Sequence, residues 1–329
     1  MHTMSLIELA NAVCDGYHID RQAALMLHAT PDRDILELLA GADKVRRHFK
    51  ANKVSLCSIV SAKSGGCAED CAFCSQSVHH KTDIPVFPLL SVEEIAAEFK
   101  AASAYPIDRF GIVTSGKGLK GSREAQAICE TIRALANMSD GTAICASLGV
   151  LSEEVAVLLK QSGLQGYHHN IESSRRFFPQ LCSTHQFDER IGTVRIADAS
   201  GFNVCCGGIF GAGESAEDRV DMALLLRELH VDSVPLNFLV PIPGTKLARS
   251  RALEPFEILK IIAVFRYMLP EKDIRVCGGR ERNLRDLQGL VFFAGANGIM
   301  LGNYLTTKGR SPDDDLRLLA DLELETVRS

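Results

Sequence analysis

Three closely spaced cysteines lie in the segment Ser61–Ser77, which reads SAKSGGCAEDCAFCSQS. Cys67, Cys71 and Cys74 form a C-x3-C-x2-C pattern in a loop that two glycines precede. Three thiolates can hold three corners of a metal centre, whereas a structural zinc site takes four protein ligands in a closed tetrahedron. The open corner suits a [4Fe–4S] cluster with one iron free to bind a small molecule. A zinc site and three unrelated thiols are the alternatives.

The composition limits the classes of protein to which the chain can belong. Its 329 residues are 46% hydrophobic, enough for two ordinary domains or one large barrel. A formal net charge of -5 without a basic stripe argues against a nucleic-acid partner. The sequence has no run of about 18 apolar residues, so no membrane span is expected. Its first residues lack the basic region of a signal peptide, so no signal peptide is expected either. Eleven cysteines in such a chain predict a cytoplasmic protein whose thiols bind metal.

Short apolar runs alternate with longer amphipathic ones, as expected for repeated strand–helix units. The runs that predict strands are Val54–Val60, Arg109–Thr114, Thr142–Leu148, Gly166–Glu172, Phe202–Ile209, Ser233–Val240, Asp273–Gly279 and Ala296–Gly302. The segments that predict helices between them are Val92–Ala102, Ser122–Asn137, Ser152–Ser162, Phe187–Ser200, Ser215–Leu229, Pro255–Met268 and Glu281–Phe293. Strand–helix units in this order predict an α/β fold, a (β/α)8 barrel of the TIM type. An open doubly wound sheet is the alternative, because periodicity cannot show closure.

Both ends of the chain are predicted to be helical. Residues 1–52 are expected to form an N-terminal helical cap, and the helices within it are Leu6–Cys14, Arg21–His28 and Asp34–Phe49. Residues 53–329 are expected to form one structural unit, the barrel with a C-terminal helix at Asp313–Thr326 packed outside it. Patterns that begin at Ser91 and Ser215 predict capping boxes at two helix starts.

Several predicted strands place polar or sulfur-bearing side chains on one face, because side chains alternate along a strand. The residues in these positions are Ser55, Cys57, Cys145, Ser147, Cys205, Gly207, Arg275, Cys277 and Gly279. They could not make an ordinary barrel interior, which layers of Val, Ile and Leu normally fill. An inward arginine also needs an anionic partner. A second, buried iron–sulfur cluster would satisfy the thiols and Arg275 together; inert packing cysteines are the alternative.

The other cysteines carry weaker signals. Cys206 follows Cys205 directly, so only one of the two can point inward unless a bulge intervenes. Cys14, Cys129 and Cys182 lie in predicted helices or loops and are expected to be packing residues.

Together these motifs resemble the biotin synthases, a family of radical S-adenosylmethionine (SAM) enzymes, over roughly residues 55–307. The segments that carry the resemblance are GGCAEDCAFCSQS, YHHNIESS, VCCGGIFGAGES, SVPLNFLVPIPGTKL, IRVCGGRE and FFAGANGIMLGNYLTT. The resemblance implies a sulfurtransferase that converts dethiobiotin to biotin. A [4Fe–4S] cluster with SAM would generate 5′-deoxyadenosyl radicals, and an auxiliary iron–sulfur cluster would donate the sulfur. It also implies a homodimer, an electron donor such as flavodoxin or ferredoxin, and cluster-assembly machinery as partners.

The resemblance also implies roles for individual residues, none of them catalytic beyond the cofactors. The residues that match ligands of the SAM-binding cluster are Cys67, Cys71 and Cys74. The residues that match SAM contacts are Thr114, Ser115, Gly116, Asn170, Glu172, Ile209 and Val240. The residues that match the substrate pocket are His168, Asn170 and Asn237. The residues that match auxiliary-cluster ligands are Cys145, Cys205 and Arg275.

The sequence departs from the best-described family members near the auxiliary cluster. Gly111 occupies the position of a cysteine ligand, whereas Cys57 and Cys277 occupy positions where the pattern has serine. His168 occupies the position of a substrate-contacting asparagine, where it could bind the ureido or carboxylate end of the substrate or be a satisfied core histidine. His169 is expected to face the other side of its strand and pack.

We therefore expect an auxiliary cluster of altered composition, of two-iron or four-iron type. Its expected protein ligands are Cys57, Cys145 and Cys205. Arg275, Cys277 or an extra sulfide would lie at the fourth corner.

Two other functions are compatible with the cysteine loop. One is another radical SAM activity of the same subfamily, of the hydrogenase-cofactor maturase or amino-acid mutase type. The other is a non-catalytic iron–sulfur or zinc protein. The thiols on the predicted strands favour the biotin synthase interpretation, and His168 leaves the first alternative open.

Overall fold

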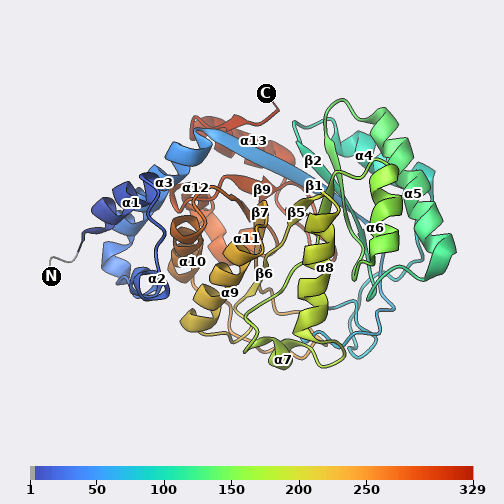
Figure 1. Cartoon of the computed structure of the whole chain (residues 1–329), viewed down its shortest axis with the longest axis horizontal. Coiled ribbons are helices and arrows are strands. Elements are labelled where there is room, and N and C mark those ends of the chain that lie inside the picture. The colour runs from blue at the N-terminus through green and yellow to red at the C-terminus, as the bar shows by residue number, and fades with distance from the viewer. Residues whose placement is uncertain (1–3, 329) are drawn as a thin grey trace.

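A closed barrel of parallel strands lies at the centre of the computed structural model, which describes residues 4–328 (Figure 1). The strands of the wall are β1 (Lys53–Lys63), β2 (Arg109–Thr114), β3 (Ala143–Ser147), β4 (Gly166–His168), β5 (Asn203–Cys205), β7 (Ser233–Phe238), β8 (Asp273–Val276) and β9 (Gly298–Met300). They pair in this order, and β9 pairs in turn with β1, with Cys57 opposite Met300. The predicted (β/α)8 barrel is therefore confirmed, and the open doubly wound sheet is wrong.

The predicted strand Phe202–Ile209 is divided in two. β5 ends at Cys205, and the chain resumes as β6 (Gly208–Phe210), which pairs with β7. At the break, a Cβ on Gly207 would lie 2.0 Å from the backbone oxygen of Pro235 in β7. Pro235 has no N–H to donate, so the ladder between β5 and β7 is short. Cys206 packs in the outer core, while Cys205 stays on the inner side of the wall.

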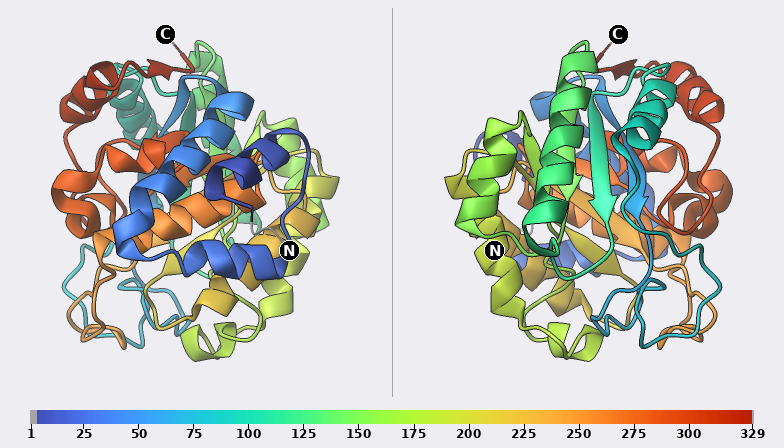
Figure 2. Two further views of the ribbon diagram at one scale, coloured as in Figure 1. Left: turned by 90° about the vertical axis from the view of Figure 1, so that its left-hand side faces the viewer. Right: turned by 90° about the vertical axis from the view of Figure 1, so that its right-hand side faces the viewer.

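Helices surround the strands in the expected alternation (Figures 1 and 2). They are α4 (Val92–Ala102), α5 (Gly121–Met138), α6 (Glu153–Gln161), α8 (Phe187–Ala199), α9 (Ala216–Glu228) and α10 (Pro255–Met268). The predicted capping boxes are confirmed at Ser91 and Ser215, which begin α4 and α9. The four-residue helix α7 (Phe178–Leu181) was not predicted, because so short a segment shows no helical period.

The last part of the chain departs from the predicted helices. Glu281–Phe293 is not one helix: α11 (Arg280–Leu284), the 3-10 turn η2 (Arg285–Leu287) and α12 (Leu290–Phe293) replace it. Arg285 adopts a positive φ of 53°, which ends α11. The C-terminal helix α13 (Pro312–Asp321) is also shorter than predicted. Glu323 has a φ of 54°, and β10 (Glu325–Thr326) then adds to β1.

The N-terminal helices lie along one flank of the barrel (Figure 2). They are α1 (Leu6–Cys14), α2 (Arg21–His28), η1 (Asp32–Asp34) and α3 (Ile35–Lys50), close to the predicted bounds. α3 packs against α1 and α10, and α2 packs against α9 and α10. The hydroxyl of Tyr267 in α10 donates to the backbone oxygen of Leu6 at 3.0 Å. A Cβ on Gly41 would lie 1.9 Å from that hydroxyl, so glycine permits the close approach of α3 to α10.

The hydrophobic core lies between the strands and the helices. Outward-facing strand residues such as Leu56, Ile112 and Ile274 are fully buried in it. These apolar contacts stabilise the wall from outside, which leaves the inner side free to carry polar groups. Within residues 4–328, no helix has both the length and the apolar character needed to cross a membrane.

The buried ion pair between Arg280 and Asp315 should be important for stability, because it joins α11 to α13. The two side chains are 1% and 0% exposed, and Arg280 Nη1 donates to Asp315 Oδ1 at 3.0 Å. The substitution Asp315→Ala leaves a guanidinium buried without its counter-charge. We expect the free energy of unfolding in urea to fall by about 3–5 kcal/mol.

The matched control is Asp314→Ala, because the neighbouring Asp314 side chain is 44% exposed. Its expected effect is below about 0.5 kcal/mol. Equal losses in the two variants would contradict the assigned role of the pair.

Candidate functional site

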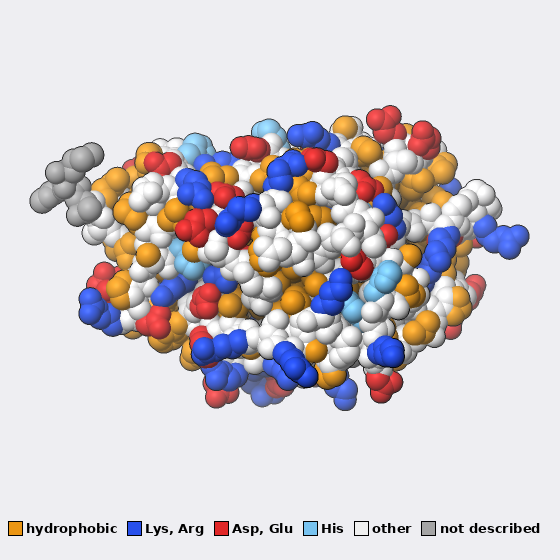
Figure 3. All heavy atoms as spheres, turned by 90° about the horizontal axis from the view of Figure 1, so that it is seen from below, with side chains coloured by type: hydrophobic (Ala, Val, Ile, Leu, Met, Phe, Trp, Pro, Cys, Tyr) orange, Lys and Arg blue, Asp and Glu red, His pale blue; other side chains and the backbone are white. Residues whose placement is uncertain are grey.

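A cavity of about 410 Å³ opens at the carboxyl ends of the strands. Figure 3 views this face of the molecule, with hydrophobic side chains near its middle and charged ones around them. All of the residues predicted to hold the SAM cluster, SAM or the substrate line this cavity: Cys67, Cys71, Cys74, Thr114, Ser115, Gly116, His168, Asn170, Glu172, Ile209, Asn237 and Val240. The structure therefore brings together residues that are dispersed over most of the barrel sequence.

The cysteine loop leaves the barrel at the end of β1 and folds back on itself. Cys67 N–H donates to Gln76 at 3.1 Å, and Val78 N–H donates to Cys67 at 2.8 Å. Gly65 makes the turn with a φ of 74°, and a Cβ there would lie 2.6 Å from Val86 Cγ2. The hydroxyl of Ser115 donates to Gly65 O at 2.7 Å and ties this loop to the end of β2.

The three loop thiols are not gathered around the position of a single zinc ion. Around zinc, ligand atoms about 2.3 Å from the metal lie within about 4 Å of one another. Among residues 4–328, the group of three potential ligand atoms within 4.8 Å of one another is Cys71, Cys182 and His185, and the loop thiols do not form such a group. Burial raises the pKa of Cys74 to about 11. Iron bound to this thiol would displace its proton.

The side chains at the end of β4 and just after it form a chain of hydrogen bonds along the cavity wall. His168 Nε2 lies 2.9 Å from Asn170 Oδ1, which also accepts from Gly207 N–H at 3.1 Å. Asn170 Nδ2 lies 3.4 Å from Glu172 Oε2. Burial lowers the pKa of His168 and raises that of Glu172. A neutral His168 and the polar edge of Asn170 are thus available to a neutral polar group such as a urea.

The backbone around Glu172 is fixed by its contact with β6. Glu172 has a φ of 68°, and its carbonyl accepts from Ile209 N–H at 2.9 Å. A Cβ on Gly208 would lie 2.3 Å from Glu172 O, so only glycine permits this approach. Asn237 braces the other side of β6, because its Nδ2 donates to Gly208 O at 3.1 Å.

His169 differs from its expected position. It lines the cavity together with His168, and its buried Nε2 has no partner among the described residues. The prediction that His169 packs on the opposite face is wrong, because β4 ends at His168 and strand alternation stops there.

The residues proposed for the auxiliary cluster lie deeper in the barrel. Cys57, Cys145 and Cys205 retain accessible surface although they are deep within the protein, so this surface faces the barrel interior. A hydrogen bond from Cys277 and the charge of Arg275 together lower the pKa of Cys57 to about 7, although burial opposes the shift. A Cβ on Gly166 would lie 2.7 Å from Cys145 Sγ, so glycine leaves room for that thiol.

Two guanidinium groups lie among these thiols. Arg275 Nε donates to Ser233 Oγ at 2.8 Å, but its buried Nη1 and Nη2 have no hydrogen-bond partner in residues 4–328. Burial opposes the charge of Arg275, yet Cys57 and Asp108 raise its pKa. Arg275 Nη2 also lies 3.6 Å from Asp273 Oδ2 and 3.9 Å from Asp108 Oδ2, so two carboxylates balance its charge, while its free donors fit an electron-rich sulfide cluster. Arg109 was missed by sequence reasoning. It lies opposite Cys57 in the β1–β2 register, and its buried Nε makes no hydrogen bond within residues 4–328, although Asp108 Oδ2 lies 3.6 Å away.

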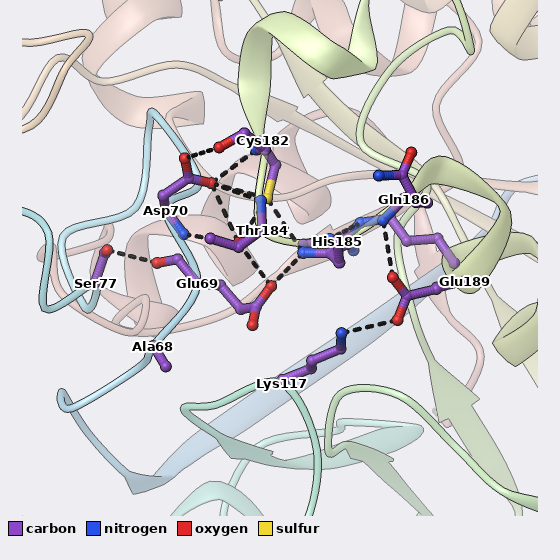
Figure 4. Close-up of polar contacts among 12 residues, drawn as sticks. Ala68, Glu69, Asp70, Ser77, Lys117, Cys182, Thr184, His185, Gln186 and Glu189 are labelled. Atoms are coloured by element: carbon purple, nitrogen blue, oxygen red, sulfur yellow. Dashed lines mark hydrogen bonds and ion pairs between the residues drawn. The ribbon is translucent and has the colours of Figure 1, made fainter.

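Cys182 packs in the hydrophobic core as predicted, but its thiol also makes polar contacts that the prediction did not include. Its sulfur lies 3.2 Å from Asp70 Oδ1 and 3.2 Å from His185 Nδ1 (Figure 4). The predictions for Cys129, which lies in the hydrophobic core, and Cys14, which packs against it, are confirmed.

Glu214 is a further residue that the sequence did not identify. Its carboxylate accepts from Gly211 N–H at 2.8 Å and from Ala212 N–H at 2.9 Å. Arg219 Nε donates to the same carboxylate at 2.8 Å. This buried pair fixes the glycine-rich loop that follows Ile209. The only sequence feature that points to this region is the capping pattern that begins α9 directly after Glu214.

Comparison with protein-family models matches residues 62–226 to the radical SAM superfamily and residues 235–325 to the biotin and thiamin synthesis associated domain. The first match includes the complete cysteine loop. With the closed barrel and the cavity at its mouth, it identifies the chain as a radical SAM enzyme.

The chain is 49% identical over 320 residues to the biotin synthase of Geobacter metallireducens. It is 51% identical over 320 residues to that of Geobacter sulfurreducens. Each alignment covers 97% of this chain and 97% of the relative. The chain belongs to the biotin synthase family.

Two solved structures resemble the fold. A methylornithine synthase aligns with a TM-score of 0.86 at 21% identity, covering 97% of both chains. An FeFe-hydrogenase maturase from Carboxydothermus hydrogenoformans aligns with a TM-score of 0.82 at 18% identity, covering 98% of this chain and 79% of that one. At these identities the likeness shows the barrel fold alone.

The loop held by Glu214 gives a testable prediction for cofactor affinity. In Glu214→Gln, the side-chain oxygen can satisfy only one of the two backbone donors and loses its charge beside Arg219. We expect the Kd for SAM, measured by equilibrium binding to the reconstituted enzyme, to rise about tenfold.

The matched control is Glu217→Gln, because Glu217 is exposed three positions further along the chain. Its Kd for SAM should equal that of the wild type. An unchanged Kd in Glu214→Gln would show that the loop held by Glu214 does not contribute to SAM binding.

Proposed function

We propose that this chain inserts sulfur into dethiobiotin to form biotin, using two iron–sulfur clusters that face one barrel interior. The residues proposed to hold the SAM-binding [4Fe–4S] cluster are Cys67, Cys71 and Cys74. Those proposed for the auxiliary cluster are Cys57, Cys145 and Cys205, with Arg275 or Cys277 at the fourth position. When bound, these groups supply the electron that cleaves SAM to methionine and a 5′-deoxyadenosyl radical, and the sulfur that enters the product.

The observation that carries the proposal is the stacking of the two thiol sets along the barrel axis. Ile59 and Ser147 line the cavity, and each lies two positions beyond a deeper thiol, Cys57 or Cys145. Two strand residues span roughly 7 Å. A substrate in the cavity would therefore lie between the cysteine loop and the deeper thiols, within reach of both.

The remaining side chains position the reactants and exclude water. Ile209 and Val240 offer apolar surface to adenine, and the Glu172 carboxylate can accept hydrogen bonds from the ribose hydroxyls. Thr114, Ser115 and Gly116 would contact the methionine part of SAM. His168, Asn170 and Asn237 would contact dethiobiotin. Enclosure matters because each radical must meet its intended atom at roughly 3–4 Å before side reactions compete.

Several further expectations are part of the proposal. We propose a cytoplasmic homodimer, reduced by a flavodoxin or ferredoxin and supplied by cluster-assembly machinery. We also propose that residues 1–52 act as a cap and that 53–329 form one unit; the outer ends of both ranges lie outside the described residues.

Product analysis with SAM, reductant and dethiobiotin tests the reaction. The wild type should form both deoxyadenosine and biotin. In Cys57→Ala, deoxyadenosine formation should continue while biotin formation falls by at least tenfold, because only the deeper cluster loses a ligand. The control Cys129→Ala should retain both products, because this cysteine lies in the outer core. Deoxyadenosine without biotin in the wild type would favour another radical SAM activity.

The composition of the auxiliary cluster can be measured separately. Mössbauer spectra of enzyme with both clusters filled test the proposed four-iron form, which would add a second four-iron component from the deeper site to that of the SAM-binding cluster. A pure two-iron signature for that site would reject the four-iron form.

A further inference from the structure

A buried arginine connects the N-terminal helices to the glycine-rich loop that follows Ile209. Arg219, in α9, is 5% exposed, and its Nε donates to Glu214 Oε1 at 2.8 Å. Glu214 in turn accepts two backbone N–H groups of that loop. Because Ile209 lines the cavity, the orientation of Arg219 affects the side of the cavity where SAM is proposed to bind.

The other end of the Arg219 guanidinium contacts two neighbouring helices. Its Nη1 lies 2.8 Å from Glu257 Oε1, in α10, and 3.1 Å from Nε2 of His28, the last residue of α2. Nη1 carries two hydrogens, so it can donate to both acceptors at once. Figure 2 shows the N-terminal helices on the flank of the barrel, where α2 packs against α9 and α10. His28 therefore brings these helices into contact with the arginine that holds Glu214.

The contact with Arg219 requires a neutral His28. A guanidinium can only donate hydrogen bonds, so Nε2 must accept, and the single ring proton lies on Nδ1. A second proton, on Nε2, would remove this acceptor and place an imidazolium beside the Arg219 cation. The charged groups that face His28 are Arg219 in α9 and both Glu257 and Lys260 in α10.

The surroundings of His28 favour the neutral ring. Burial lowers the pKa of His28 the most, and the cations Arg219 and Lys260 also lower it, whereas Glu257 opposes them. The Glu257 side chain is 41% exposed, so solvent screens its charge. The acceptor on His28 is therefore present at neutral pH. It is lost progressively as the pH falls below about 6.5, the pKa of an unperturbed histidine.

We propose that His28 is a positioning residue for SAM binding: its ring orients Arg219, and Arg219 orients Glu214 and the loop of Gly211 and Ala212. The inference rests on the proposed function only in that this loop borders the SAM site. Protonation of His28 would leave Arg219 with its two carboxylate partners but with a repelling cation at the other side. SAM should then bind more weakly, although no described residue of the N-terminal helices lines the cavity.

Equilibrium binding of SAM to the reconstituted enzyme, between about pH 5.5 and about pH 8, tests the proposal. His28→Gln keeps an acceptor in the place of Nε2 and does not titrate, whereas His28→Leu has no acceptor. At the upper pH, the Kd of His28→Gln should match that of the wild type, and the Kd of His28→Leu should be about threefold higher.

The pH profile gives the second readout. As the pH falls across this range, the ratio of the wild-type Kd to the His28→Gln Kd should rise about threefold, because only the wild type loses its acceptor. Taking the ratio at each pH removes the titration of His168, His169 and His185, which line the cavity and are common to both proteins.

Two controls separate this role from a general loosening of the N-terminal helices. His18→Gln replaces an exposed histidine in the same part of the chain and should leave the wild-type pH profile unchanged. Arg21→Ala breaks the ion pair of α2 with Asp221 in α9, which has an Nε–Oδ1 distance of 2.7 Å and does not involve Arg219. Its Kd for SAM should equal that of the wild type.

A Kd in His28→Leu equal to that of the wild type, or a ratio that does not change with pH, would overturn the proposal. The same holds if Arg21→Ala raises the Kd as much as His28→Leu does, because the docking of α2 alone would then explain the effect. A wild type that contains the cluster but binds no SAM at any pH would instead contradict the proposed function.

Discussion

The parallel pairing of β1 with β9 closes the barrel, and the position of every proposed ligand depends on this pairing. β1 contributes to both thiol groups, because its middle carries Cys57 and its end leads directly into the loop of Cys67. The interval from Cys57 to Lys63 spans roughly 20 Å of extended chain. This one strand therefore fixes how deep Cys57 lies in the barrel and places the loop of Cys67 at the barrel mouth. Without closure, Cys57 and Cys145 would be parts of an open surface, and the deeper group would not be enclosed.

The outer side of the barrel wall provides stability, and the inner side carries the groups proposed for function. Outward side chains such as Ile112 and Ile144 are buried beneath the helices and supply the hydrophobic core. The inner side carries thiols and two guanidiniums whose donors are only partly satisfied. Asp108 and Asp273 balance the charge of Arg275, but the guanidinium donors that remain unsatisfied cost stability unless a bound group accepts from them. The apolar outer layer makes such an interior tolerable, which explains how the fold can keep Arg275 buried beside a space for a cofactor.

Much of this architecture could be predicted from sequence periodicity, because strands and helices repeat in a regular order and β-formers mark the wall. The cysteine loop was predictable from its spacing, and the cavity-lining residues from family motifs. The polar contacts of Cys182 were not, because its contact with Asp70 joins residues 112 positions apart. Arg285 ended a predicted helix through a positive φ that its residue type does not signal. Arg109 could have been found, since it alternates with Gly111 on a strand already assigned.

The central claim is that one barrel encloses two iron–sulfur assemblies, one at its mouth and one at its base. Anomalous diffraction at the iron edge, from crystals of anaerobically reconstituted enzyme, measures this directly. The account predicts two separate iron peaks in each chain, one against Cys67, Cys71 and Cys74, and one against Cys57, Cys145 and Cys205. A single peak, or zinc in place of iron at the loop, would contradict it.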